Sequence, residues 1–193
     1  MAIPWMGHFM LEQDLLRQWI RDAKAGDAAA FERIVMLHER MVLRTAQRLL
    51  LNPEDAKDAA QEVFLRLHRN LDRFREREEL GPWLRRITVN ICLDAMRRSR
   101  RETHVEGTVD VPCPALDPEE ALSRTQQREL IAAALGRLSE RERVTIVLRD
   151  LEGCTTSEVA EILGSTETTV RSQISTGRAK IRSFVAAQLR KRR

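Results

Sequence analysis

Two segments of this chain contain side chains whose types suit contact with a polyanion. In the first, residues 80–101, Trp83 precedes six arginines, and the only acidic residue is Asp94. Guanidinium groups pair with phosphates, and an aromatic ring among them can stack on an unpaired base. A core tryptophan beneath a solvated arginine face would have the same composition, so this segment alone leaves both interpretations open.

The second segment, residues 155–182, has the sequence TTSEVAEILGSTETTVRSQISTGRAKIR and a basic second half. Helical spacing predicts an outward face that carries Glu167, Thr168, Arg171, Ser172, Gln173, Ser175 and Arg178. In the major groove of DNA, arginine pairs with guanine and glutamine pairs with adenine. An ordinary helical hairpin with a solvated basic face is the alternative interpretation.

Two short helices and a tight turn would position these side chains. Thr155 and Glu158 fit a capping box at the start of the first helix. Gly164 stands where the end of a helix requires a positive φ angle, which glycine adopts at low cost. Val170 and Ile174 are one turn apart and would pack back on the first helix. The pattern predicts a helix-turn-helix, whose second helix enters the major groove.

Charge is distributed unevenly along the 193 residues. Residues 1–101 contain 19 basic and 15 acidic side chains, residues 102–123 contain none and six, and residues 124–193 contain 14 and eight. The chain is therefore two basic bodies joined by an acidic segment, with a net charge of +4. This arrangement favours a polyanionic partner over a membrane surface.

Several functional classes find no support in the composition. Cys92, Cys113 and Cys154 lack CxxC spacing, and with four scattered histidines they predict no metal site and no cofactor. No stretch approaches the roughly 18 apolar residues of a membrane span, and the apolar start lacks the pattern of a signal peptide. Because no nucleophile is paired with a base, we expect a protein that is not an enzyme and has no small-molecule substrate. The three scattered cysteines lead us to expect a cytoplasmic protein. Its thiols are expected to be reduced, with redox-sensitive Cys92 or Cys113 as the alternative.

Helical periodicity and the scarcity of strand signals predict an all-α fold. Apolar stripes predict helices at about 11–25, 28–51, 53–73 and 82–101, with Asp27 and Asn52 as N-caps. Residues 102–117 have no helical period and include two prolines, and the stripes after them predict a four-helix unit that ends in the helix-turn-helix. We therefore predict two small helical domains, 1–101 and 118–193, joined by an extended acidic linker at 102–117.

Two blocks of sequence, in this order, resemble the extracytoplasmic-function sigma factors, the small class of bacterial transcription initiation factors. The first block contains DAKDAAQEVFLRLHRNLDRF at 55–74 and PWLRRITVNICLDAMRR at 82–98. The second contains LSERER at 138–143, LEG at 151–153 and AEILG at 160–164. The resemblance covers about 27–101 and 119–182, and it implies core RNA polymerase and promoter DNA as partners, with an anti-sigma factor as a further partner.

The resemblance implies two roles for the first block. One face of the 53–73 helix would bind polymerase through Asp58, Gln61, Glu62 and Leu65. The 82–101 helix would meet and help to open the −10 promoter element through Trp83, Asn90, Asp94, Arg97 and Arg98. The loop at 75–80, with Arg75 and Arg77, would hold an extruded base, although it is strongly charged where the family's loop is often rich in Gly and Ser.

By the same resemblance, the second block would meet the −35 element through Glu167, Thr168, Arg171, Ser172, Gln173 and Arg178. The acidic linker would run through the polymerase cleft toward the RNA exit path, where it has the same sign of charge as RNA. A plain solvated tether is the alternative. Two other functions stay open: a helix-turn-helix regulator that acts without polymerase, which leaves the 55–98 block unexplained, and a helical adaptor for acidic proteins, which predicts weak, sequence-blind DNA binding.

Overall fold

A computed structural model describes residues 4–74, 79–103 and 122–191. These residues form helices and no strand, which confirms the predicted all-α fold. The helices are α1 (Pro4–Lys24), α2 (Ala28–Leu50), α3 (Pro53–Asn70), η1 (Leu71–Arg73), α4 (Leu80–Thr103), α5 (Leu122–Gly136), α6 (Glu140–Ile146), η2 (Val147–Leu151), α7 (Thr156–Leu163) and α8 (Glu167–Lys191). None of the described helices is both long enough and apolar enough to cross a membrane.

The predicted domain boundaries fall close to helix ends. Helix α4 continues to Thr103, two residues beyond the predicted end of the first domain, and α5 begins at Leu122. The rest of the predicted linker, 104–117, lies outside the described residues, and so does the predicted start of the second domain at 118–121. Helix α1 begins at Pro4, earlier than the expected start near residue 11.

Helix boundaries in the N-terminal group, α1–α4, follow from the capping residues. The carboxylate of Asp27 accepts from the N–H groups of Ala29 at 2.8 Å and Ala30 at 3.2 Å, and thereby caps α2. The side chain of Asn52 accepts from Glu54 N–H at 2.9 Å, with a proline in the first turn of α3. Both predicted N-caps are confirmed, and each supplies an acceptor to N–H groups that have no partner within the helix.

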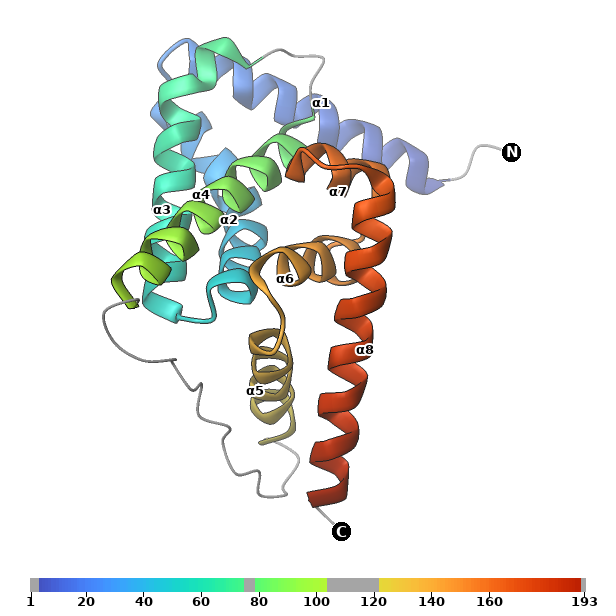
Figure 1. Cartoon of the computed structure of the whole chain (residues 1–193). Helices are drawn as coiled ribbons and strands as arrows, with labels where there is room; N and C mark the ends of the chain where they lie inside the picture. Colours follow the sequence, from blue (N-terminus) through green and yellow to red (C-terminus); the bar gives the residue numbers. More distant parts are fainter. Residues whose placement is uncertain (1–3, 75–78, 104–121, 192–193) are drawn as a thin grey trace.

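The core of the N-terminal group lies where α2, α3 and α4 pack together (Figure 1). Its largest fully buried side chains are Ile34, Leu49, Leu67 and Leu84. Burial of such a side chain contributes about 1.5–3 kcal/mol. The apolar stripes predicted from the sequence therefore coincide with the core, and they fix which faces of α3 and α4 remain outside.

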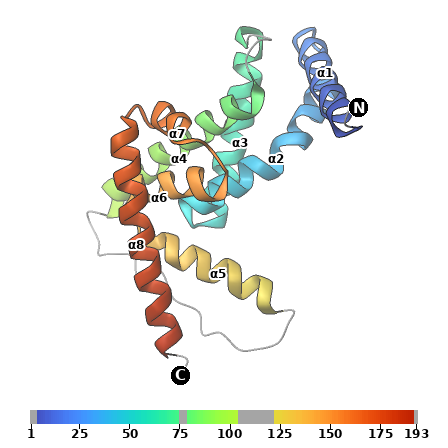
Figure 2. The same cartoon turned by 90° about the vertical axis from the view of Figure 1, so that its right-hand side faces the viewer.

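The C-terminal group, α5–α8, has a smaller core built around Val144, Leu148, Val159 and Val170. The predicted capping box of α6 is present, since Ser139 and Glu142 exchange hydrogen bonds of 2.9 and 3.4 Å. Helix α8 runs to Lys191, well past the predicted end near residue 182. Figures 1 and 2 show that the C-terminal part of α8 extends away from α1–α4.

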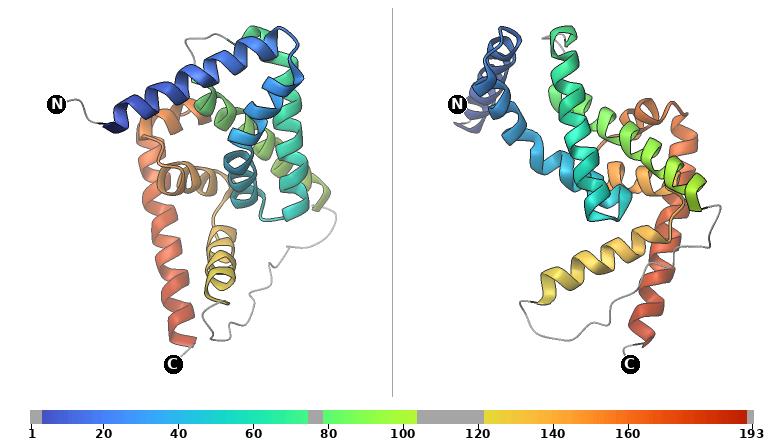
Figure 3. Two further views of the ribbon diagram at one scale, coloured as in Figure 1. Left: turned by 180° about the vertical axis from the view of Figure 1, so that it is seen from behind. Right: turned by 90° about the vertical axis from the view of Figure 1, so that its left-hand side faces the viewer.

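The two groups of helices are in direct contact. Helix α6 lies against both α2 and α4, and η2 lies against α2. Figure 1 and both views of Figure 3 show α7 beside the first half of α4, although their sequences are more than fifty residues apart. The buried apolar side chains of both groups form one continuous cluster.

Candidate nucleic-acid interface

Helix α4 has an apolar face that packs on the core and an opposite polar face that points outward. Its buried side contains Leu84, Val89 and Cys92, each with no exposed surface. Because side chains three or four positions apart share a helix face, this packing turns Asn90 and Asp94 outward. Both are exposed, as predicted. The exposed Arg97 and Arg98 follow one turn later, and Arg97 donates to Asp94 at 3.2 Å.

Trp83 lies half-buried in the first turn of α4. Its ring meets the buried ring of Phe74 edge to face, with centroids 5.8 Å apart and an interplanar angle of 73°. Part of the indole therefore packs on the core while the side chain remains partly accessible, so features of both predicted interpretations are present. Arg75 and Arg77 lie outside the described residues.

The outer face of α3 carries the residues that the resemblance assigns to polymerase. Asp58 and Gln61 are exposed, and Leu65 keeps 44% of its surface accessible. Glu62 accepts from Arg66 at 2.8 Å, and this hydrogen bond lowers the pKa of the Glu62 carboxyl. The four residues therefore form one surface that is both apolar and charged.

The predicted helix-turn-helix is confirmed as α7, a turn at Gly164 and α8. Thr155 N–H donates to Glu158 at 2.6 Å, and Glu158 N–H donates back to the Thr155 hydroxyl at 3.2 Å. Gly164 has φ +57°, the left-handed conformation that glycine adopts most readily. Val170 and Ile174 are buried against the preceding helices, so the rotation of α8 about its axis is fixed.

The exposed face of α8 carries Thr168, Arg171 and Ser172, as predicted. Glu167, half-buried at the start of the helix, pairs with Arg171 one turn later. These four residues adjoin the turn, at the end of the helix that enters the groove in a helix-turn-helix.

Two residues that were predicted to contact the −35 element form hydrogen bonds with other side chains of the protein. Gln173 is half-buried, unlike its outward-facing prediction, because its amide oxygen accepts from the hydroxyl of buried Thr145 at 2.8 Å. Arg178 is exposed, but its guanidinium binds both oxygens of Asp150, at 2.6 and 2.9 Å. This pairing raises the pKa of Arg178.

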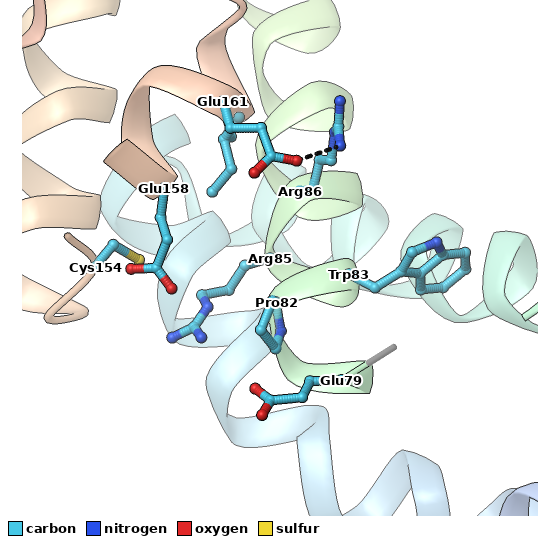
Figure 4. A pocket seen from close by; sticks show the side chains of 9 residues that line it. Glu79, Pro82, Trp83, Arg85, Arg86, Cys154, Glu158 and Glu161 are labelled. Atoms are coloured by element: carbon cyan, nitrogen blue, oxygen red, sulfur yellow. Dashed lines mark hydrogen bonds and ion pairs between the residues drawn. The ribbon is translucent and has the colours of Figure 1, made fainter. Parts of the chain in front are cut away.

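A pocket of about 410 Å³ opens between α4 and α7 (Figure 4). It is lined by Glu79, Pro82, Trp83, Arg85, Arg86, Cys154, Glu158, Glu161 and Ile162. Arg86 donates to Glu161 at 3.2 Å, and Figure 4 shows Trp83 extending away from Glu158. The pKa of Glu158 is lowered mainly by the hydrogen bond from Thr155, and the charge of Arg85 acts in the same direction.

The sequence patterns did not indicate three residues that hold the helices together. Arg143 and Glu152 connect the two groups of helices, and Asp150 holds Arg178. The contacts that give them these roles span between 28 and 104 positions of the chain, so no local pattern indicated them. Asp150 lies in η2, a π-helical turn, and such turns are rare.

The two described thiols are buried and free of disulfides. Burial raises the pKa of Cys92 to about 12 and also raises that of Cys154. Because the thiolate is the reactive form, this supports the inert interpretation of Cys92 over the redox-sensitive one. Cys113 lies outside the described residues. Among the described residues, no cluster of three His, Cys, Asp or Glu could hold a metal ion.

Comparison with known protein families matches two segments of the chain, in the predicted order. Residues 34–102 match the Sigma-70 region 2 family, and residues 128–181 match the Sigma-70 region 4 family. The chain is 35% identical over 160 residues to the ECF RNA polymerase sigma factor SigM of Mycobacterium tuberculosis, covering 81% of this chain and 78% of that protein.

Solved structures show the same fold. CnrH, solved in complex with the cytosolic domain of CnrY, is 26% identical, with a TM-score of 0.63 over 90% of this chain and 98% of that one. The sigma factor RpoE of Bartonella quintana, solved with the anti-sigma factor NepR, is 23% identical, with a TM-score of 0.62 over 81% and 96%. With its two sigma regions and this degree of identity, the chain belongs to the extracytoplasmic-function sigma factors.

Proposed function

We propose that this sigma factor divides promoter recognition between two exposed helix faces, one on α4 in region 2 and one on α8 in region 4. The observation that carries the proposal is that each face is polar or basic and is fixed in orientation by fully buried residues behind it, Leu84 on α4 and Val170 on α8. A rigid helix with outward polar side chains is what base and phosphate contacts require.

In region 2, the −10 element is contacted by Trp83, Asn90, Asp94, Arg97 and Arg98, with Arg75 and Arg77 in the preceding loop. The indole of Trp83 is already held in place by its contact with Phe74, so stacking of its ring on an extruded base requires little reordering of the side chain. Asn90 and Asp94 offer hydrogen-bonding groups to the adjacent base pairs. In holoenzyme, Trp83→Ala is expected to reduce the permanganate reactivity of the −10 thymines while binding to the −35 element is retained.

In region 4, the −35 element is contacted by Glu167, Thr168, Arg171, Ser172, Gln173 and Arg178. A bidentate contact between Gln173 and adenine requires release of Thr145, which now holds the amide oxygen. Arg171→Ala is expected to weaken binding by about 1–3 kcal/mol if the residue reads a guanine, and only on promoters that contain that guanine. An equal loss on all sequences would assign Arg171 to a phosphate instead.

Polymerase is bound by the α3 face of Asp58, Gln61, Glu62 and Leu65. Compact apolar and charged helix faces of this kind suit helix-on-helix recognition. The test is a pull-down with core polymerase and Glu62→Lys, which is expected to reduce association while circular dichroism stays unchanged. Glu54→Lys is the matched control, because Glu54 is an exposed acid on the same helix and pairs with Lys57. Equal retention of both variants would refute the assignment of this face.

Further parts of the proposal follow from family membership. The polymerase performs the chemistry of RNA synthesis, so this chain acts in the cytoplasm as a non-enzymatic subunit. An anti-sigma factor is a partner, since NepR is bound to the related RpoE and CnrY to CnrH. The acidic segment 102–117 runs toward the RNA exit path. A regulator that acts without polymerase, or an adaptor, would fail the pull-down, which therefore separates these alternatives.

A further inference from the structure

A lysine near the end of α1 bonds to the backbone far along the chain. Lys24 is half-buried in the last turn of α1. Its ammonium donates to the carbonyl oxygen of Phe74, 50 positions later, at 2.6 Å. Phe74 directly follows η1 in an extended conformation, with φ −66° and ψ 127°, so its backbone has left the helix. A hydrogen bond from a charged donor is shorter and stronger than a neutral one, and this one ties α1 to the point where the chain leaves η1.

The fold holds Lys24 in place for this bond. Ile20, one turn earlier on the same face of α1, is only 4% exposed and fixes the rotation of the helix. The helix ends at Gly26, which has φ +95°, and the N–H of Asp27 donates to the carbonyl of Asp22 at 3.0 Å. Because Asp27 also caps α2, the end of α1 is fixed to the start of α2. The lysine stem can therefore lie along apolar surface while its ammonium reaches a carbonyl.

Phe74 connects Lys24 to Trp83. The Phe74 side chain is 3% exposed, and its ring meets the indole edge to face with centroids 5.8 Å apart. Trp83 stands in the first turn of α4, where its backbone N–H donates to the carbonyl of Glu79 at 3.3 Å. The backbone of α4 fixes where the side chain begins but leaves its two side-chain torsions free. The ring of Phe74 restricts these torsions, and Lys24 restricts Phe74.

The family match does not account for this contact. It covers residues 34–102, so it begins within α2 and does not include Lys24 or any other part of α1. Helix α1 nevertheless contacts both α2 and η1. A role for α1 must therefore be derived from its contacts, and the bond from Lys24 to Phe74 connects it to a side chain that we assign to the −10 element.

We propose that Lys24 is a positioning residue for the −10 element: through Phe74 it holds the indole of Trp83 in the orientation in which an extruded base stacks on it. A ring that is fixed before binding loses little side-chain freedom when a base stacks, whereas a loose ring must be ordered in the complex. The inference rests on the proposed function for its consequence on promoter DNA, but the orientation of Trp83 can be measured in the free protein.

The first measurement follows the indole of Trp83 in the free, full-length chain. Phenylalanine replaces the other two tryptophans, Trp5 and Trp19, so that the nanosecond fluorescence anisotropy reports Trp83 alone. Lys24→Met keeps an unbranched stem but removes the ammonium, and it is expected to add a fast component to the decay. Lys24→Arg keeps a charged donor and should restore the wild-type decay. Arg21→Met is the matched control, because Arg21 lies in the same last turn, carries the same charge and donates to a neighbour within α1.

The second measurement is the affinity of the holoenzyme for a single-stranded −10 oligonucleotide, taken from the non-template strand of a promoter that the wild-type holoenzyme opens. Because Lys24 removes the cost of ordering one side chain, Lys24→Met is expected to weaken binding about two- to twelvefold relative to Arg21→Met. In a Trp83→Ala background the ring is absent, so Lys24→Met should cause no further loss. This non-additivity distinguishes a residue that acts through Trp83 from one that only stabilises the fold.

Each outcome supports or overturns the proposal. An anisotropy decay that Lys24→Met leaves unchanged would show that Lys24 does not hold the indole. Equal losses of oligonucleotide binding with and without the Trp83 ring would overturn the route through Trp83. If the decay changes but Trp83→Ala binds the oligonucleotide as well as wild type, the assignment of Trp83 to the −10 element fails, and with it the role of Lys24 on DNA, while the contact inside the protein stands. Should circular dichroism show that Lys24→Met is unfolded, Lys24→Gln, which is polar but shorter, must give the same fast component.

Discussion

Regions 2 and 4 fix their DNA-facing helices in different ways. In region 2, α4 packs along much of its length between α2 and α3, and its position depends mainly on apolar burial. In region 4, α8 is held by a short apolar contact and by directed polar bonds from α6 and η2. These are the bonds of Lys180 to Glu142, Gln173 to Thr145 and Arg178 to Asp150.

This difference indicates which structural changes each region can tolerate. Apolar burial is non-directional and roughly proportional to area, so region 2 should accept small shifts of α4. Hydrogen bonds depend on distance, angle and protonation state, and an unpaired buried group is costly. Region 4 should therefore respond more strongly to pH and to small changes in shape at α8.

The largest expected difference between the two regions is in the reactivity of their buried thiols, Cys92 in region 2 and Cys154 in region 4. At pH 8 an ordinary cysteine is about a quarter thiolate, whereas Cys92, with its pKa raised to about 12, is thiolate in only about one molecule in ten thousand. Iodoacetamide should therefore modify Cys92 about a thousandfold more slowly than a free thiol. Mass spectrometry of a Cys113→Ser background checks this. Cys154, which lines the pocket between the regions, should react faster than Cys92, and equal rates would contradict the difference in burial.

Removal of a fully buried leucine from each region is the next largest test. Leu84→Ala in region 2 and Leu148→Ala in region 4 each leave a cavity and should lower the free energy of unfolding by about 2–5 kcal/mol in urea. Leu37→Ala, at a position 55% exposed, should have little effect. If the interface couples the regions, each variant shifts a single transition. Two separate transitions in wild type would show that the regions unfold independently.

Local sequence patterns predicted the elements well and their contacts poorly. Asn52 followed by Pro53, and Thr155 followed by Glu158 and Gly164, marked helix boundaries because capping depends on a few adjacent residues. The apolar stripes predicted which faces of α3 and α4 are buried, and so where their outward residues lie.

Contacts between distant residues were outside the reach of the same reasoning. The bond from Arg143 to the Leu49 carbonyl spans 94 positions, and the pairing of Arg178 with Asp150 spans 28. Such contacts are decided by how packed helices meet, which a one-dimensional pattern does not encode. For the same reason, Gln173 was predicted to face outward, although Thr145 holds its amide oxygen.

Gly177 in the middle of α8 gives a test of intermediate size. A Cβ atom at this position would lie 2.8 Å from Cγ1 of Ile146, so glycine permits the close approach of α8 and α6. Gly177→Val should destabilise the protein by about 1–3 kcal/mol through overpacking. Combination with Ile146→Ala should recover part of the loss, because that change removes the contacted atoms. Ala179→Val, exposed on the same helix, should cost only a few tenths of a kcal/mol, and an equal cost would mean that the close approach is unimportant.

The smallest expected effect concerns the polar bonds that distinguish region 4. Lys180 binds the Glu142 carboxylate at 2.7 and 2.9 Å and, together with the hydrogen bonds of Ser139, lowers its pKa. A carboxyl whose pKa is lowered by folding stabilises the protein at pH values above its pKa in the unfolded state, which is about 4.3 for glutamate. This stabilisation is lost as the pH falls through the folded pKa.

Glu142→Gln should lower the free energy of unfolding by about 1 kcal/mol at pH 7, measured by urea denaturation, and the difference from wild type should shrink below about pH 4.3. Glu62→Gln, at an exposed pair on α3, should change stability far less. A Glu142→Gln difference that persists undiminished at pH 3 would show that packing, rather than charge, holds α8 on α6.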